Sequence, residues 1–197
     1  MSKTLGFNAF ELYLFISVLI GWILSEHIGA NIIPYLRRHG AKIRKKERGS
    51  YLLVGVNMYA TIIVAFVFAI RGIALLPVWT LYPGILLVIL GTMVRQWAIA
   101  VLGRFFSTTV GVQEGQKVVK TGPYRLIRHP SYAGMFMILL GIGMMLHSWG
   151  AILLQIIFIC VGFGYRIHAE EKLLVKELGE EYIQYMKKTK KVIPYLL

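Results

Sequence analysis

Two short segments of this 197-residue sequence carry side chains that could do chemistry in an otherwise apolar chain. Residues 122–132 read GPYRLIRHPSY and residues 166–171 read RIHAEE, with one apolar stretch between them. Ionisable groups at membrane depth are costly, so they are usually retained for function. If the apolar stretch folds back on itself as a hairpin, the two segments meet at the same end of it.

The residue types in these segments indicate how they would be positioned. Gly122-Pro123 is typical of a turn, and His129-Pro130 is typical of the first turn of a helix. Arg166 is four residues before Glu170, so the two share one helix face and a structural ion pair between them is an open alternative to a functional role. The sequence has no glycine-rich dinucleotide or P-loop motif and no Ser–His–Asp signature.

Composition decides the class of protein that must position these residues. Hydrophobic residues make up 57% of the chain and the mean hydropathy is +0.65, above the roughly 45–50% of a soluble domain. The net charge of +13 raises the possibility of nucleic-acid binding. That function is excluded because the basic residues lie in short loops between apolar runs, where they orient a membrane protein. Cys160 is the one cysteine, and no metal-binding spacing occurs.

The lengths of the apolar runs predict an all-α integral membrane protein with about five transmembrane helices. The first three runs are residues 10–33, 51–70 and 81–102. A longer run over 133–165 is broken at 147–150, which predicts that the last two helices form a hairpin with a tight turn. Glycines at 141, 143, 162 and 164 would allow close helix contact.

Polar features between and after these runs predict the topology. Residues 37–48 are rich in Lys and Arg, which favours a cytoplasmic loop. The N-terminus is then outside, and the 103–132 connection and the C-terminus are inside. Apolar residues at helical spacing after Glu170 predict a C-terminal amphipathic helix. Residues 1–102 would supply three transmembrane helices and residues 103–197 the connection, the hairpin and the last helix, all in one structural domain.

Four ionisable residues interrupt the predicted spans, and the first of them, Glu11, is expected at the membrane interface. Glu26 and His27 lie near the end of the first run, where extension toward the membrane surface is the favoured interpretation. Arg95 lies about 10 Å, or seven residues, from the end of the third run. Extension to the cytoplasmic face and a position in a polar cavity are equally open for Arg95.

The polar motifs taken together resemble one family. Residues 116–124 (QKVVKTGPY), 128–132 (RHPSY), 166–171 and 179–182 (GEEY) are similar to the isoprenylcysteine carboxyl methyltransferase family, whose wider group includes phospholipid N-methyltransferases. The resemblance covers about the C-terminal half. It rests on the joint occurrence of Arg-His-Pro-x-Tyr, a hairpin and Glu-Glu.

The resemblance implies S-adenosylmethionine as the methyl donor, bound at the cytosolic side without a Rossmann domain, and no metal. Arg166 corresponds to an arginine at the acceptor end and is the candidate catalytic residue. Thr109 is a further candidate. The expected cofactor-binding residues are Gln116, Lys117, Val118, Val119, Tyr124, His129, Pro130, Ser131, Tyr132 and Glu170.

The residue types suit methyl transfer to a carboxylate. An anionic carboxylate needs no general base, so the site has only to orient donor and acceptor, and an arginine can hold a carboxylate through paired hydrogen bonds. The expected partners are the lipid bilayer and a lipophilic acceptor such as an isoprenylcysteine, with no nucleic acid. A phospholipid amine N-methyltransferase and a non-enzymatic transport or assembly protein stay open as alternatives.

Overall fold

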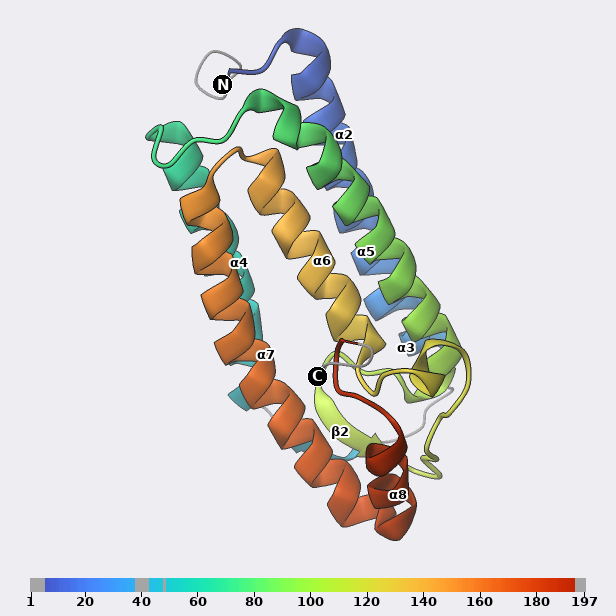
Figure 1. Ribbon diagram of the computed structural model, residues 1–197. Helices are drawn as coiled ribbons and strands as arrows, with labels where there is room; N and C mark the ends of the chain where they lie inside the picture. The colour runs from blue at the N-terminus through green and yellow to red at the C-terminus, as the bar shows by residue number, and fades with distance from the viewer. Residues whose placement is uncertain (1–5, 38–42, 48, 194–197) are drawn as a thin grey trace.

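The computed structural model describes residues 6–37, 43–47 and 49–193. Helices dominate them (Figure 1), and a 3₁₀ or π turn joins several of the helices. The helices are α2 (Ala9–Glu26), η1 (His27–Ile32), α3 (Ile33–Arg37), α4 (Gly49–Ile70), η2 (Val78–Thr80), α5 (Leu81–Leu102), η3 (Gly103–Phe105), η4 (Gly122–Arg125), α6 (Pro130–Met145), α7 (Trp149–Leu178) and α8 (Glu180–Lys188); the strands are β1 (Ile43–Glu47) and β2 (Val110–Gln113).

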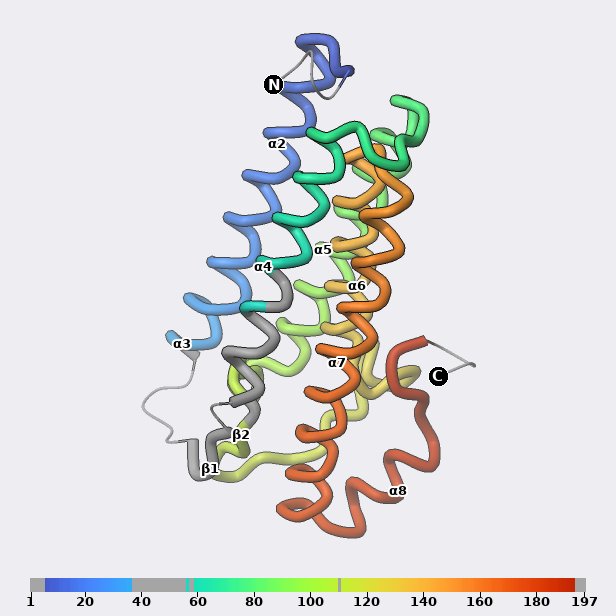
Figure 2. The backbone as a smooth tube through the Cα atoms, turned by 90° about the vertical axis from the view of Figure 1, so that its left-hand side faces the viewer, coloured from blue at the N-terminus to red at the C-terminus, as the bar shows by residue number. Residues whose placement is uncertain are grey.

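Helices α2, α4, α5, α6 and α7 lie side by side and run along a common direction (Figures 1 and 2). Helix α5 packs most extensively against α6, α4 packs against α7, and α2 packs against α5. Apolar side chains form most of the core between them, and Leu81, Ile138 and Ile142 are fully buried. β2, α8 and the connection before α6 gather at one end of the bundle, and the N-terminus lies at the other end.

Within the described part of the chain, three helical segments are long and apolar enough to cross a bilayer, namely Ala9–Leu36, Val78–Phe105 and Trp149–Leu178. Large apolar side chains such as Ile63, Leu86 and Ile157 point outward and stay exposed. A soluble protein rarely exposes so much apolar surface, so the chain is an integral membrane protein. Helix α6 has 16 residues and is about 24 Å long at 1.5 Å per residue, which is short for the roughly 30 Å hydrocarbon core.

Several element boundaries differ from the sequence prediction. The third apolar run is helical over the predicted residues 81–102, but the first helical run continues past residue 33 to Arg37 through the π-helix η1. Helix α7 continues without a break to Leu178, so the amphipathic tail is not a single helix starting near residue 170. The break comes at Gly179, whose φ of +59° favours glycine, and α8 follows it.

An antiparallel pair of short strands adds to the predicted all-α architecture. β1 pairs with β2, with Lys46 opposite Gly111 and Glu47 opposite Val110. The pairing attaches the chain after α3 to the connection that leads toward the polar motifs. Strand β1 falls in the lysine- and arginine-rich segment 37–48; residues 38–42 and 48 of that segment lie outside the described residues.

Glycines bring α5 and α6 into backbone contact at two levels. A Cβ on Gly84 would lie 2.7 Å from the carbonyl oxygen of Gly141, and a Cβ on Gly91 would lie 2.6 Å from that of Gly134. Small residues at a helix interface allow such close approach in membranes. The predicted role in helix contact therefore holds for Gly141. It is wrong for Gly164, where a Cβ would meet nothing within 4 Å.

We expect Gly134→Ala to destabilise the protein by about 1–3 kcal/mol, the usual cost of overpacking. A Cβ there would lie 2.6 Å from the Gly91 carbonyl oxygen and 2.8 Å from the backbone nitrogen of Arg95, so α6 must move away from α5. The matched control is Gly164→Ala, which replaces a helical glycine in open space. Thermal unfolding in detergent measures both, and equal unfolding temperatures would contradict the contact.

Candidate functional site

The residues before α6 are held in place by the C-terminal segment. The backbone N–H of Arg128 donates to the carbonyl of Lys190 over 2.8 Å, and that of His129 donates to Lys191 over 2.9 Å. His129 then precedes the first residue of α6, and Pro130 occupies the first helical position, where its missing N–H has no cost. The Arg-His-Pro-Ser-Tyr sequence is thus fixed between the core and the end of the chain.

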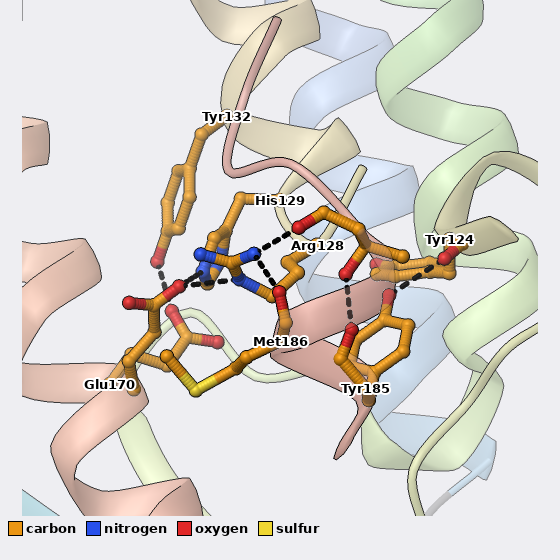
Figure 3. Close-up of polar contacts among 9 residues, drawn as sticks. Tyr124, Arg128, His129, Tyr132, Glu170, Tyr185 and Met186 are labelled. Atoms are coloured by element: carbon orange, nitrogen blue, oxygen red, sulfur yellow. Dashed lines mark hydrogen bonds and ion pairs between the residues drawn. The ribbon is translucent and has the colours of Figure 1, made fainter. Parts of the chain in front are cut away.

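A buried ion-pair cluster joins this segment to α7 and α8 (Figure 3). Arg128 Nε donates to Glu171 Oε1 over 2.8 Å, and His129 Nε2 lies 3.2 Å from the same oxygen. Arg128 Nη1 also donates to the carbonyls of Met186 and Thr189. His129 is 4% exposed, so this histidine and Glu171 serve mainly to join three helices.

A second cluster brings together Arg166, Tyr132 and Glu170. The Tyr132 hydroxyl donates to Glu170 Oε2 over 2.7 Å and accepts from Arg166 Nε over 2.6 Å. Arg166 Nη2 donates to the carbonyl of Thr108. The tyrosine hydroxyl thus lies between the two charged groups, and among the described residues no direct ion pair is recorded between Arg166 and Glu170. The spacing of Arg166 and Glu170 had left a direct ion pair between them open. The structure shows a bridge through the Tyr132 hydroxyl instead.

Three tyrosines near the connection remain neutral donors at ordinary pH. Burial raises the pKa of Tyr185 to about 12, and burial with the nearby Glu170 carboxylate raises the pKa of Tyr124 and Tyr182 well above the usual range. The Tyr185 hydroxyl donates to the Tyr124 carbonyl over 2.7 Å (Figure 3). This bond fixes η4 against α8.

A large cavity of about 550 Å³ runs from these clusters into the helix bundle. Its polar end is lined by residues of both clusters and of the 107–119 connection. Its other end is lined by apolar side chains from the helices: Leu19, Trp22, Ile23, Ile62, Phe66, Met135, Ile142 and Phe163. The cavity therefore offers a polar compartment that continues into an apolar one at the depth of the membrane.

The structure brings the sequence-predicted site residues together around this cavity. Arg166 lines it, as does Thr109. Pro130 is not among the lining residues and instead begins α6. The other nine expected cofactor residues all line it: Gln116, Lys117, Val118, Val119, Tyr124, His129, Ser131, Tyr132 and Glu170.

Sequence reasoning missed one pair at the cavity wall. Arg95 Nε donates to Glu26 Oε2 over 2.6 Å, Nη2 donates to Glu26 Oε1, and Nη1 donates to Ser131 Oγ over 2.6 Å. Of the two positions that the sequence left open for Arg95, the structure shows the one in a polar cavity. For Glu26 the favoured interpretation, extension to the membrane surface, is wrong. The sequence signal for this pair was an acidic residue in one apolar run and a basic residue in another.

The fold and cavity define a helical integral membrane protein whose polar site opens into the bilayer region. Residues 84–176 match the model of the Isoprenylcysteine carboxyl methyltransferase (ICMT) family. The chain resembles this family through that segment, which holds the polar motifs before α6 and in α7.

Named relatives agree with this assignment. The chain is 36% identical over 115 residues to "Protein-S-isoprenylcysteine O-methyltransferase" of Saccharomyces cerevisiae, covering 57% of this chain and 48% of the relative. It is 28% identical over 179 residues to "Protein-S-isoprenylcysteine O-methyltransferase B" of Arabidopsis thaliana, covering 87% of each. The yeast match thus spans about half of that relative's length.

A solved structure shares the fold. It is described as the eukaryotic intramembrane Ras methyltransferase ICMT, and its TM-score to this chain is 0.64 at 22% identity. The match covers 92% of this chain and 67% of the other. The arrangement of α2 through α8 is therefore a fold that this membrane-embedded protein shares.

Proposed function

We propose that this chain is an S-adenosylmethionine-dependent methyltransferase that esterifies the carboxylate of an isoprenylcysteine-like thioether in the membrane. The carrying observation is the cavity that joins a polar cluster to an apolar compartment between the helices. An acceptor with an apolar tail and a charged head fits such a cavity, with its head beside Arg166. The names of the relatives point to the same acceptor class.

The charges around the cavity favour an anionic acceptor. Its lining includes four cationic side chains, Arg95, Lys117, Arg128 and Arg166, and two carboxylates, Glu26 and Glu170. Glu171 neutralises Arg128 from outside the lining, so four cations against three carboxylates leave one positive charge in excess. A carboxylate gains from this excess of positive charge and attacks without losing a proton. A phospholipid ammonium would be repelled and would first need a base, so the cavity favours the carboxylate over the amine.

The residues of the polar end fit the proposed cofactor. Residues 116–119 line the cavity, and Glu170 presents a carboxylate that can accept hydrogen bonds from hydroxyl or ammonium groups. Neutral Tyr124 adds an aromatic face. When bound, S-adenosylmethionine supplies an electrophilic methyl group on a sulfonium.

The protein's own contribution to the reaction is orientation. Arg166 uses Nε and Nη2 for Tyr132 and Thr108, and no further bond to its Nη1 is recorded among the described residues. We infer that Nη1 holds one oxygen of the acceptor carboxylate, while the bonds to Tyr132 and Thr108 fix the guanidinium. Holding both reactants in one enclosed site provides the rate enhancement.

A direct assay tests the proposed function. Purified chain in nanodiscs is incubated with methyl-labelled S-adenosylmethionine and either an S-farnesyl thioether carboxylate or phosphatidylethanolamine. Label is expected in a base-labile ester of the thioether. Label in the phospholipid would favour the amine methyltransferase, and no saturable cofactor binding would favour a non-enzymatic membrane protein.

Glu170→Gln is expected to weaken S-adenosylmethionine binding about 10- to 150-fold, the equivalent of a charged hydrogen bond of about 1.5–3 kcal/mol. Glutamine keeps the shape and can still accept from Tyr132, so the fold should survive. Glu181→Gln is the matched control, because Glu181 forms an exposed pair with Lys120 away from the cavity. Calorimetric titration measures both, and equal affinities would remove Glu170 from the site.

We further infer that α2, α4, α5, α6 and α7 are five membrane spans, with α6 and α7 as the hairpin. The turn between α6 and α7 contains His147 and Ser148, and Thr80 Oγ1 lies 3.1 Å from His147 Nδ1. Packing of α5 along α6 supports residues 1–102 and 103–197 as one structural domain. Most exposed lysines lie at the α8 end, which favours the cytoplasm for that end and the outside for the N-terminus.

Cysteine labelling in intact cells tests this orientation. In a Cys160→Ser background, Trp149→Cys at the hairpin turn should react with an impermeant maleimide from outside. Lys120→Cys should react only after the membrane is opened. Both positions have exposed side chains, so a reversed pattern would mean that the orientation is wrong.

A further inference from the structure

A lysine segment, residues 187–191, lies where α8 ends. Four of its five residues are lysines, and all four lysines are exposed. The fifth, Thr189, is buried, and its hydroxyl donates to the Tyr185 carbonyl over 2.8 Å. Among the described residues, no hydrogen bond or ion pair is recorded for the four lysine side chains, and residues 182–193 include no acidic residue. The segment therefore presents four positive charges that its own surroundings do not neutralise.

The end of a helix accounts for only two of these charges. Lys187 and Lys188 occupy the last turn of α8, and Glu180 and Glu181 occupy its first turn. That distribution is the one that the helix dipole favours. Lys190 and Lys191 lie beyond the last helical residue, so the dipole does not explain their charges.

Backbone contacts hold these two lysines at the start of α6. Their carbonyls accept from the N–H groups of Arg128 and His129, and the Lys190 N–H donates to the Leu126 carbonyl over 3.5 Å. The Arg128 guanidinium reaches the same segment through the Thr189 carbonyl. Figures 1 and 2 both show the chain turning back from α8 toward the start of α6.

The length of α6 gives the depth of this junction in the bilayer. Its 16 residues extend about 24 Å, and the hydrocarbon core is about 30 Å thick. With the α6–α7 turn at one boundary of the hydrocarbon, the first residue of α6 lies within about 6 Å of the other boundary. Lys191, bonded to the residue just before α6, is therefore at the depth where lipid head groups begin.

Exposed apolar side chains flank the lysine segment. Leu126 is 54% exposed and Ile193 is 40% exposed, and Arg125 beside Leu126 adds a further exposed cation. Apolar side chains among unpaired cations are typical of a surface that lies on a membrane. The apolar groups can enter the boundary layer while the long lysine side chains extend to the phosphates.

We propose that the lysine segment, together with Arg125, binds the head groups of anionic phospholipids in the adjoining leaflet. Each lysine near an anionic membrane surface contributes about 5-fold in affinity. The bound lipid also keeps the segment on the Arg128-His129 backbone, because leaving it would carry the lysines away from the head groups and so lose this binding. This binding does not depend on the proposed function.

Two phospholipids that share their acyl chains and their phosphate test the proposal. The purified chain is equilibrated in detergent with equal amounts of dioleoylphosphatidylglycerol and dioleoylphosphatidylcholine, and native mass spectrometry counts the molecules of each that remain bound. We expect the unaltered chain to retain the anionic lipid about 10-fold more. Lys190→Gln/Lys191→Gln should lower this ratio about 5-fold or more. The junction uses the backbone atoms of both residues, so the fold should survive.

The matched control is Lys172→Gln/Lys176→Gln, which also removes two exposed lysines. These lysines lie in α7, where residues 170–181 include five glutamates, and the ratio should stay unchanged. An equal fall in both double variants would overturn the proposal, because the preference would then follow total charge. A ratio near one in the unaltered chain would also overturn it, and saturable binding of polyglutamate would then assign the segment to an acidic protein surface.

Hydrogen exchange tests the effect of the lipid on the polar motif. In nanodiscs with one third phosphatidylglycerol, the amides of Arg128 and His129 should exchange about 5-fold more slowly than in pure phosphatidylcholine. In Lys190→Gln/Lys191→Gln the two compositions should give similar rates. Equal rates for the unaltered chain in both compositions would overturn the proposed stabilisation of the motif.

Discussion

Glu171→Ala is expected to destabilise the protein by about 3–5 kcal/mol, the usual cost of removing one partner of a buried ion pair. Its carboxylate accepts from Arg128 and lies against His129, and all three side chains are at least nine-tenths buried. The substitution leaves the Arg128 charge without its counterion where α6, α7 and α8 meet. At about 2–4 °C per kcal/mol, the unfolding temperature should fall by roughly 6–20 °C.

The neighbouring glutamate provides the control for this result. Glu170→Ala alters the next residue of the same helix, but the Glu170 carboxylate bonds the Tyr132 hydroxyl rather than a buried cation. Thermal unfolding in detergent should therefore show a large shift for Glu171→Ala and a small one for Glu170→Ala. Equal shifts, or a larger one for Glu170→Ala, would contradict the division of roles between the two carboxylates.

Arg166→Ala is expected to lower methyl transfer at least about 100-fold while leaving S-adenosylmethionine affinity largely intact. One charged hydrogen bond to the acceptor contributes about 1.5–3 kcal/mol, equivalent to about 10- to 150-fold. The Tyr132 hydroxyl also loses its Arg166 donor, which adds to the loss. Single-turnover rates and calorimetric affinities on the same purified variant separate the two effects.

Arg166→Lys serves as the conservative variant. The planar guanidinium reaches Tyr132, Thr108 and an acceptor carboxylate at once, and a lysine ammonium cannot reproduce this geometry. The methyl-transfer activity of Arg166→Lys should therefore stay low. A parallel loss of cofactor affinity and transfer in Arg166→Ala would reject the acceptor role and make Arg166 a structural partner of Tyr132. Full activity would remove it from the site.

The helices were predictable where hydropathy alone determines them. Helix α5 occupies residues 81–102 as expected, because an apolar run bounded by Pro77 and Gly103 leaves few other choices. The polar residues that line the cavity were predictable as a group, since the motifs of residues 116–132 and 166–171 flank one apolar stretch. The resemblance supplied their roles, which spacing could not.

Features that depend on contacts between distant residues were not predictable. The β1–β2 pair depends on an antiparallel register between Lys46 and Gly111, which no local pattern encodes. The Glu26–Arg95 pair joins residues 69 positions apart. The division between Glu170 and Glu171 follows from a helix rotation of about 100° per residue, which turns one toward Tyr132 and the other toward Arg128.

The length of α7 connects the site to the thickness of the bilayer. Its 30 residues span about 45 Å, against about 30 Å of hydrocarbon. From Trp149, an exposed aromatic residue at its first position, Arg166 lies about 26 Å and Glu170 about 32 Å along the axis. With Trp149 at one interface, the two residues straddle the opposite one. A thicker membrane would draw Glu170 below the head groups, so we expect the proposed activity to depend on the width of the membrane.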